Sequence, residues 1–152
     1  MSNKIIWLTG QSGAGKTTLA KALQKEYPCI VLDGDDMRKS ISLGAGFSLA
    51  DRNQHNCKVA RLANELSKQT NVIIAVIAPV SATRIWIDTN YPSITFVYVK
   101  RTLPAREGHF YEEPVDYPTV DHDRLDIESS LNVLKQIMGI SEHPEPVDDY
   151  KI

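Results

Sequence analysis

The feature that most constrains this chain is a glycine-rich run close to its start. Residues 10–18 read GQSGAGKTT and match the pattern G-x-x-x-x-G-K-[ST] at every position. Glycine permits backbone conformations in which successive N–H groups point inward, and a following helix adds the partial positive charge of its N-terminus. Such a loop predicts a site for the phosphates of a nucleoside triphosphate. The residues expected to bind them are Gly10, Gln11, Ser12, Gly13, Ala14, Gly15, Lys16, Thr17 and Thr18.

The residues on either side of this run support the same prediction. Ile5–Thr9 is a short apolar segment typical of a strand, and apolar residues recur at helical spacing after the run. In a strand, loop and helix of this order, Lys16 reaches the β- and γ-phosphates of ATP and the Thr17 hydroxyl binds Mg²⁺. A glycine-rich turn with a chance lysine is the alternative, and the complete pattern in this context disfavours it.

The composition narrows the class of ligand. The 152 residues carry a net charge of -2 and the pI is about 6.1, so the chain lacks the basic character typical of nucleic-acid binding. Cys29 and Cys57 form no C-x-x-C pair, the first residues show no signal-peptide pattern, and no apolar run approaches a membrane span. We therefore expect a cytoplasmic protein that acts on a small molecule, with neither nucleic acid nor a membrane as a partner.

Beyond the glycine-rich run, short apolar segments alternate with amphipathic ones. Strands are expected over residues 5–9, 28–33, 71–78 and 94–99, with a weaker one near 119–120. Helices are expected directly after the glycine-rich run and over residues 51–69, 82–89 and 127–139. This alternation predicts an α/β fold of the P-loop NTPase type, with an open parallel sheet of about five strands flanked by helices. We expect one kinase domain over residues 1–139 and an acidic, proline-containing tail over 140–152 that is extended or disordered.

A second group of polar residues follows the second expected strand. In a sheet of this kind ligands bind beyond the carboxyl ends of the strands, where both the glycine-rich run and Asp33–Asp36 fall. Asp35 is suited to accept a proton from a substrate hydroxyl, and Asp33 is suited to hold Mg²⁺ or its waters. Arg38 and Arg52 are suited to grip phosphate-like groups in forked geometry. A surface turn with solvated charges is the alternative for this group.

Taken together, these blocks resemble the adenylylsulfate (APS) kinases, P-loop enzymes that use MgATP to phosphorylate the 3′-hydroxyl of adenosine 5′-phosphosulfate. The resemblance rests on Gly10–Thr17, Leu32–Arg38, Gly46–Ser48 with Asp51 and Arg52, Ile77–Pro79 with Arg84, and Tyr111–Pro114. It implies a nucleotide-kinase fold and a role in sulfate assimilation. It also implies that Asp35 is the base, that Arg38 and Arg52 bind the nucleotide acceptor, that Phe47 stacks on its base and that Ile77 lines its pocket.

The chain departs from the family pattern on the side of the acceptor. Family members carry a long lid rich in Lys and Arg after the fourth strand, whereas only residues 100–110 occupy that place here. His55 replaces a family asparagine, with Asn56 following it, and we assign both, together with Asp33, to the acceptor site. These changes leave open a different acceptor, such as a cytidine-based phosphoramidate conjugate. They also leave open a homodimer in which a partner chain completes the cover. The cations left in the short segment are Lys100, Arg101 and Arg106, and Phe110 is its ring; each is more often a solvated loop residue.

Two other classes of protein share the glycine-rich run. A GTPase switch needs a D-x-x-G motif and an N-K-x-D-type motif, and the sequence has neither. A non-catalytic nucleotide-binding regulator remains an alternative, although Lys16, Thr17, Asp33 and Asp35 would drift once phosphoryl transfer was no longer needed. The sequence therefore favours a phosphotransferase with an alcohol group as acceptor, with ATP and Mg²⁺ as its cofactors and Lys16 and Asp35 as its catalytic residues.

Overall fold

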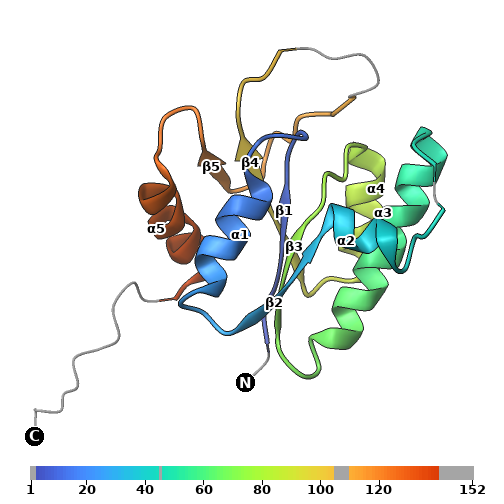
Figure 1. The fold of residues 1–152 in the computed structure, drawn as a ribbon, viewed down its shortest axis with the longest axis horizontal. Coiled ribbons are helices and arrows are strands. Elements are labelled where there is room, and N and C mark those ends of the chain that lie inside the picture. The colour runs from blue at the N-terminus through green and yellow to red at the C-terminus, as the bar shows by residue number, and fades with distance from the viewer. Residues whose placement is uncertain (1–2, 45, 105–109, 141–152) are drawn as a thin grey trace, which may run out of the picture.

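In the computed structural model, which describes residues 3–44, 46–104 and 110–140, five strands form one parallel sheet (Figure 1). Along the chain they are β1 Ile5–Thr9, β2 Cys29–Asp33, β3 Asn71–Ala75, β4 Ile94–Lys100 and β5 Thr119–Asp121. Their order across the sheet is β2-β3-β1-β4-β5, and every neighbouring pair is parallel. The predicted α/β fold is confirmed, including the short strand near Thr119.

Helices cover both faces of this sheet. They are α1 Lys16–Gln24, α2 Gly34–Lys39, α3 Leu49–Leu66, α4 Ser81–Asn90 and α5 Ile127–Met138. In Figure 1, α1 and α5 lie against one face, whereas α3 and α4 lie against the other. The carboxyl ends of the strands, and the loops that follow them, lie together at the upper edge in this view.

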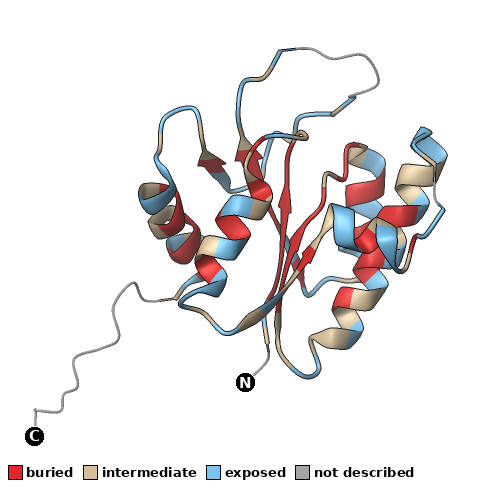
Figure 2. Cartoon of the chain, viewed as in Figure 1, coloured by how far each residue is buried: buried red, intermediate tan, exposed pale blue. Residues whose placement is uncertain are grey.

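The central strand β1 holds the two layers together, because its side chains alternate between the two faces. Ile5 and Trp7 pack into the cluster under α3 and α4, and Ile6 and Leu8 pack into the cluster under α1 and α5. All four are buried, and Figure 2 shows burial concentrated on the strands and on the inner sides of the helices. Burying each such side chain contributes about 1.5–3 kcal/mol.

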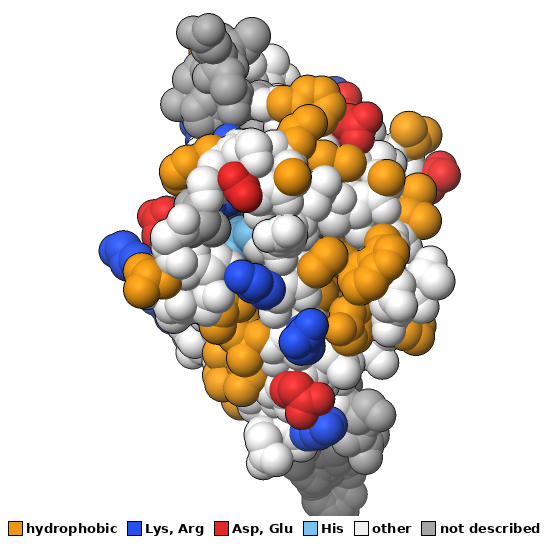
Figure 3. Space-filling view, turned by 90° about the vertical axis from the view of Figure 1, so that its right-hand side faces the viewer, with side chains coloured by type: hydrophobic (Ala, Val, Ile, Leu, Met, Phe, Trp, Pro, Cys, Tyr) orange, Lys and Arg blue, Asp and Glu red, His pale blue; other side chains and the backbone are white. Residues whose placement is uncertain are grey.

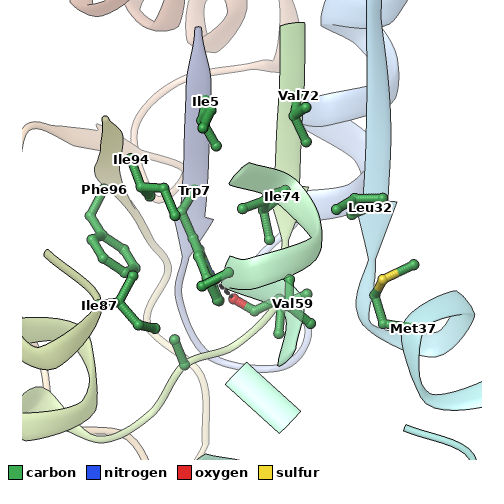
Figure 4. Packing of buried hydrophobic residues seen from close by; sticks show 14 residues of the cluster. Ile5, Trp7, Leu32, Met37, Val59, Val72, Ile74, Ile87, Ile94 and Phe96 are labelled. Atoms are coloured by element: carbon green, nitrogen blue, oxygen red, sulfur yellow. Dashed lines mark hydrogen bonds between the residues drawn. The ribbon is translucent and has the colours of Figure 1, made fainter. Parts of the chain in front are cut away.

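Trp7 illustrates how this core also fixes the upper edge of the sheet. Its ring is fully buried and points toward Ile74 and Val59, between the sheet and α3 (Figure 4). The indole Nε1–H donates to the Val76 carbonyl oxygen at 2.9 Å. A buried indole N–H needs such a partner, so the core tryptophan also holds the chain just beyond β3.

Two differences from the sequence-based expectation bear on the site. β3 ends at Ala75 rather than Ala78, because the carbonyls of Val76 and Ile77 accept side-chain hydrogen bonds and Ala78 adopts a φ of 49°. No helix was expected directly after the second strand, but the short helix α2 begins there at Gly34. Both changes lie at the edge where the predicted ligands bind.

The ends of the helices follow ordinary capping chemistry. Ser48 and Asp126 accept backbone N–H groups at the first turns of α3 and α5, and Gly139 closes α5 with a φ of 74°. Among the described helices, none combines the length and apolar character needed to cross a bilayer. Residues 141–152 of the expected tail lie outside the described residues, so the boundary at 139 stays a prediction.

Candidate functional site

The glycine-rich loop joins β1 to α1 and has the backbone geometry of a phosphate cradle. Gly13 and Gly15 adopt φ values of 88° and 96°, which L side chains rarely tolerate, and Gly15 caps the N-terminus of α1. Gly10 is required for a different reason from the one expected. A Cβ at this residue would lie 2.4 Å from the Val99 carbonyl oxygen, so the loop passes β4 too closely for any side chain.

Lys16 opens α1 and turns back over this loop. Its side chain is buried, and Nζ donates to the carbonyl oxygens of Gly10 at 2.8 Å and Gln11 at 2.7 Å. Both partners are neutral, and burial lowers the pKa of Lys16 from 10.5 to about 8. The buried ammonium therefore lies where a phosphate would supply the missing negative charge.

The loop forms one wall of a cavity of about 400 Å³, which we call the donor cavity. Its lining is Ser12, Gly13, Gly15, Lys16, Thr17, Thr18, Asp33, Gly34, Asp35, Ala75, Val76, Ile77 and Arg101. The expected metal-binding pair, Thr17 and Asp33, thus faces one space. Arg101 was expected as a solvated loop residue; it is exposed, and it also lines this cavity, where its Nη1 donates to the Gly13 carbonyl oxygen at 3.1 Å. Arg101 is therefore a cation of the donor side.

The carboxylates after β2 have separate tasks in the structure. Asp33 is the N-cap of α2, and its Oδ1 accepts the Asp36 N–H at 3.0 Å. This bond fixes the start of α2 and holds Asp35 in the first helical turn. Asp35 is exposed and lines both the donor cavity and a second, adjoining cavity. The predicted base therefore stands where two ligands would meet.

The second cavity, which we call the acceptor cavity, has a volume of about 450 Å³. Its lining is Ser12, Gly34, Asp35, Arg38, Phe47, Arg52, His55, Asn56, Val76, Ile77, Ala78 and Pro79. Of the residues that the sequence assigned to the acceptor, all but Asp33 therefore come together in one space, although they belong to α2, α3 and two loops. The two cavities share Ser12, Gly34, Asp35, Val76 and Ile77, so they are continuous at Asp35.

An aromatic ring and two arginines beside it form one wall of the acceptor cavity. The Arg38 guanidinium lies 4.4 Å from the centre of the Phe47 ring, and the Arg52 guanidinium lies 5.9 Å from it. Phe47 is 67% exposed, so it is not a core residue and its ring is accessible to a ligand. Burial, together with the Arg52 charge, lowers the pKa of Arg38. The wall therefore offers a ring face and positive charge to the same ligand.

His55 and Asn56 line the same cavity and carry buried polar atoms. His55 Nδ1 lies 2.7 Å from the Ser42 hydroxyl, and both residues are at least nine-tenths buried. Within the described part of the chain, His55 Nε2 and Asn56 Oδ1 have no hydrogen-bond partner. Burial, then the charges of Arg38 and Lys58, lower the pKa of His55 to about 4, so the ring is neutral at physiological pH. Buried polar atoms without partners are costly, which makes this pair suited to a polar ligand.

Sequence analysis did not predict a hydrogen-bond network at Ala78 and Pro79, which also line the acceptor cavity. Arg84 is buried and donates from Nη1 to the Ala78 carbonyl and from Nη2 to the Glu112 carbonyl, both at 2.6 Å. The Glu112 N–H donates to the Pro79 carbonyl at 2.8 Å, and the Tyr111 hydroxyl lies 2.9 Å from Thr9 Oγ1. These bonds tie Tyr111 and Glu112 to β1 and to the turn after β3, which lines the acceptor cavity. Arg84 and Tyr111 stood in the family blocks, but nothing in their spacing indicated this contact.

The short segment after β4 is described in part. Lys100 ends β4, and Phe110 is 49% exposed. Arg106 falls among residues 105–109, outside the described residues. The expectation of a shortened lid therefore stays a prediction.

Comparison with known proteins gives one consistent family. Residues 2–109 match the family model of adenylylsulphate kinase. The adenylyl-sulfate kinase of Deinococcus deserti is 38% identical over 108 residues, which cover 67% of this chain and 60% of that protein. The adenylyl-sulfate kinase of Chloroflexus aurantiacus is 39% identical over 152 residues, which cover 95% of this chain and 75% of that protein. The chain thus spans less than two thirds of the Deinococcus relative.

A solved structure agrees with the sequence matches. The APS kinase of Mycobacterium tuberculosis in complex with AMPPNP and APS superposes with a TM-score of 0.75 at 25% identity. The superposition covers 90% of this chain and 98% of that one. The same fold therefore holds an ATP analogue and APS in that protein.

Proposed function

The chain belongs to the adenylylsulfate kinase family, and on that premise we propose that it transfers the γ-phosphoryl group of ATP to an acceptor hydroxyl. The proposed acceptor is adenosine 5′-phosphosulfate, reacting at its 3′-hydroxyl, or a similar nucleotide conjugate. One observation carries the proposal: a cavity lined by the glycine-rich loop and a cavity lined by arginines and a ring are continuous at Asp35. Phosphoryl transfer needs two bound ligands in line, and this arrangement provides for both.

On the donor side, catalysis is mainly positioning and charge neutralisation. The loop amides and the Lys16 ammonium hold the β- and γ-phosphates, and Lys16 exchanges its carbonyl partners for phosphate oxygens. Arg101 lines the same cavity and adds a second positive charge to it. The negative charge that grows on the transferring group is therefore met by groups already in place.

Mg²⁺ fits the same cavity as a companion of ATP. This ion prefers oxygen ligands, keeps several waters, and is held by one or two protein groups together with substrate phosphates. The Thr17 hydroxyl and the Asp33 carboxylate, which line one space, would hold it. When bound, the ion neutralises phosphate charge during transfer.

On the acceptor side, Asp35 orients the attacking hydroxyl and accepts its proton. The proton passes to the carboxylate as the oxygen attacks the γ-phosphorus, and ADP leaves as the bond to its β-phosphate oxygen breaks. Arg38 and Arg52 bind the acceptor's anionic groups, and Phe47 stacks on its base. Ile77 forms part of the wall shared by both cavities.

A different acceptor remains the second candidate, on a specific observation. His55 and Asn56 line the acceptor cavity, and His55 Nε2 and Asn56 Oδ1 are buried without a partner among the described residues. A side-chain rotation that opened these atoms to the cavity would let them bond an acceptor with a matching polar edge, such as a cytidine-based phosphoramidate conjugate. Sites of this kind reject analogues that leave their polar groups unpaired.

The cellular setting and assembly are part of the same proposal. ATP as donor is consistent with a cytoplasmic enzyme, and APS as acceptor would place it in sulfate assimilation. A homodimer is supported by exposed hydrophobic side chains on the face that α3 and α4 form (Figure 3). Ile85 and Trp86 of α4 are 60% and 47% exposed. The molar mass of the purified protein in solution tests this assembly.

Product analysis tests the proposed reaction. The protein is incubated with MgATP and either APS or a cytidine conjugate, and the products are separated and weighed by mass spectrometry. We expect APS to gain one phosphate at its 3′-hydroxyl. Phosphorylation of the cytidine conjugate alone would select the second candidate. Tight ATP binding with no phosphorylated product from any acceptor would favour a non-catalytic nucleotide-binding regulator.

A further inference from the structure

A histidine that the sequence analysis did not assign to the site lies against the glycine-rich loop. His122 follows β5, and its Nδ1 lies 2.7 Å from the Ala14 carbonyl oxygen, across 108 positions of sequence. A carbonyl only accepts, so Nδ1 carries the proton in this bond. His122 Nε2 is buried and has no partner among the described residues. The ring is therefore turned toward the loop by a single directed bond.

Rigid elements hold this ring in place. The His122 N–H donates to the Lys100 carbonyl at 2.8 Å, which extends the pairing of β4 and β5 by one residue. Thr102, just after Lys100, donates to the Asp123 carboxylate from both its N–H and its hydroxyl. These bonds fix the backbone of His122 and Asp123 beside the end of β4, next to the glycine-rich loop.

The bond to the Ala14 carbonyl also sets the direction of the Gly15 N–H, which belongs to the same peptide unit. Cis peptide bonds are absent among the described residues, so the Ala14 C=O and the Gly15 N–H point in opposite directions. Gly15 lines the donor cavity, and its N–H donates to no protein group in the described part of the chain. Holding the carbonyl outward therefore turns the Gly15 N–H toward the place of the phosphates.

Gly15 is also fitted to the histidine. A Cβ at this position would lie 2.7 Å from His122 Nδ1 and 3.0 Å from Cε1. Glycine is therefore needed at position 15 for two reasons: the φ of 96°, and the space that the His122 ring occupies. The contact between the loop and the histidine is as close as a hydrogen bond allows, which fits a built contact rather than a chance approach of two surfaces.

From this geometry we infer that His122 is a positioning residue of the donor site. It clamps the Ala14 carbonyl and thereby aims the Gly15 N–H at the phosphates. This inference rests on the proposed binding of ATP by the glycine-rich loop. It assigns His122 no contact with the nucleotide, because its effect passes through the backbone of Ala14 and Gly15.

The test compares variants that keep or remove the donor. His122→Leu keeps bulk and removes the N–H, and His122→Asn keeps an N–H near the place of Nδ1. We expect His122→Leu to bind MgADP about tenfold more weakly, as for the loss of one hydrogen bond to a charged group, and AMP with little change. His122→Asn is expected to restore most of the MgADP affinity. Arg124→Leu, an exposed neighbour in the same turn, is the control and is expected to bind both nucleotides normally.

Ring ¹⁵N NMR of the wild-type protein gives a readout that does not depend on any variant. We expect the Nδ1-protonated tautomer for His122. The Nε2-protonated tautomer, equal losses for MgADP and AMP, or an Asn variant as weak as the Leu variant would overturn the inference. Thermal unfolding of each variant establishes that it is folded. Wild-type protein that binds neither nucleotide would contradict the proposed function, while the tautomer would still test the clamp.

Discussion

The donor cavity and the acceptor cavity meet at Asp35, but the chain builds them in different ways. Six of the thirteen residues that line the donor cavity come from one continuous segment, Ser12–Thr18, in which Gly13 and Gly15 have positive φ values. Apart from Ser12 of the same segment, the acceptor lining comes from α2, α3, the segment before α3 and the turn after β3. Much of the donor site is therefore formed by one segment that has to keep its shape. Single residues of the acceptor site can change without altering the sheet.

The two sides also differ in how far their ligand-binding side chains are buried. Lys16 is buried and held by two backbone carbonyls of its own loop. Phe47, in contrast, is largely exposed beside Arg38. A preorganised donor site suits an invariant part such as a triphosphate, and an exposed ring suits a base that enters and leaves. We therefore expect the residues of the acceptor cavity to determine which substrate is phosphorylated.

The sharpest way to break this comparison is to remove the group at the junction. Asp35→Asn keeps the shape of the side chain and removes the proton acceptor. We expect kcat to fall by about 10²- to 10⁴-fold while ATP binds as before. Steady-state kinetics and calorimetric titration with ATP measure the two quantities. Asp36→Asn, exposed on the same helix and outside both cavities, is the matched control. Full activity in the Asp35 variant would remove its assigned role.

The donor side is tested by removing its buried cation. Lys16→Ala is expected to cost on the order of 3 kcal/mol in transition-state stabilisation, or about 10²-fold in kcat/KM for ATP. The acceptor KM is expected to change little, because Lys16 does not line the acceptor cavity. Lys21→Ala, an exposed lysine on the same helix, serves as the control. A loss confined to the acceptor KM would contradict the division into two cavities.

The acceptor side is tested by removing its ring. Phe47→Ala takes away a face on which a base can stack, a contact worth about 1–3 kcal/mol per base, so we expect the acceptor KM to rise about tenfold or more. The KM for ATP is expected to stay the same. Leu43→Ala removes another exposed apolar side chain, 78% accessible and outside both cavities, and is expected to have no effect. Equal changes in both KM values would merge the two sites into one.

The smallest expected effect is a dependence of ATP affinity on pH. Lys16 has its pKa lowered to about 8 by burial, so the free protein loses this positive charge as pH rises through 8. A phosphate binds the charged form, so ATP affinity is expected to fall by about fourfold between pH 7 and 8.5. Below pH 7 this group contributes no further change. Titrations of wild type and Lys16→Ala over this range check the account, and the variant is expected to lack this component.

Much of the fold and part of the site could be predicted because their signals are local. The glycine-rich run, the apolar strands and the spacing of α5 each lie within a few consecutive residues. α2 was missed because a helix of 6 residues has no periodic pattern, and its start depends on the Asp33 cap. Phe47 could be assigned to a ligand only through the family resemblance, since its exposure follows from packing.

The contacts that sequence reasoning could not find join distant parts of the chain. Arg84 reaches Glu112 across 28 positions, and His122 reaches Ala14 across 108. No motif or regular spacing in the sequence links the residues of either pair. The folded sheet brings them together, as it brings the end of β5 beside the glycine-rich loop. Arg101 is exposed as expected, but its place on the donor cavity also depends on the folding of the sheet.

The most direct test of two coupled cavities is the rate of ADP release from MgATP, measured with and without APS. The account predicts slow release without an acceptor and a large increase when APS, or another nucleotide conjugate that fits the acceptor cavity, is added. ADP release that no acceptor in a broad panel changes, from protein that binds ATP tightly, would contradict the claim that the two cavities work together in phosphoryl transfer.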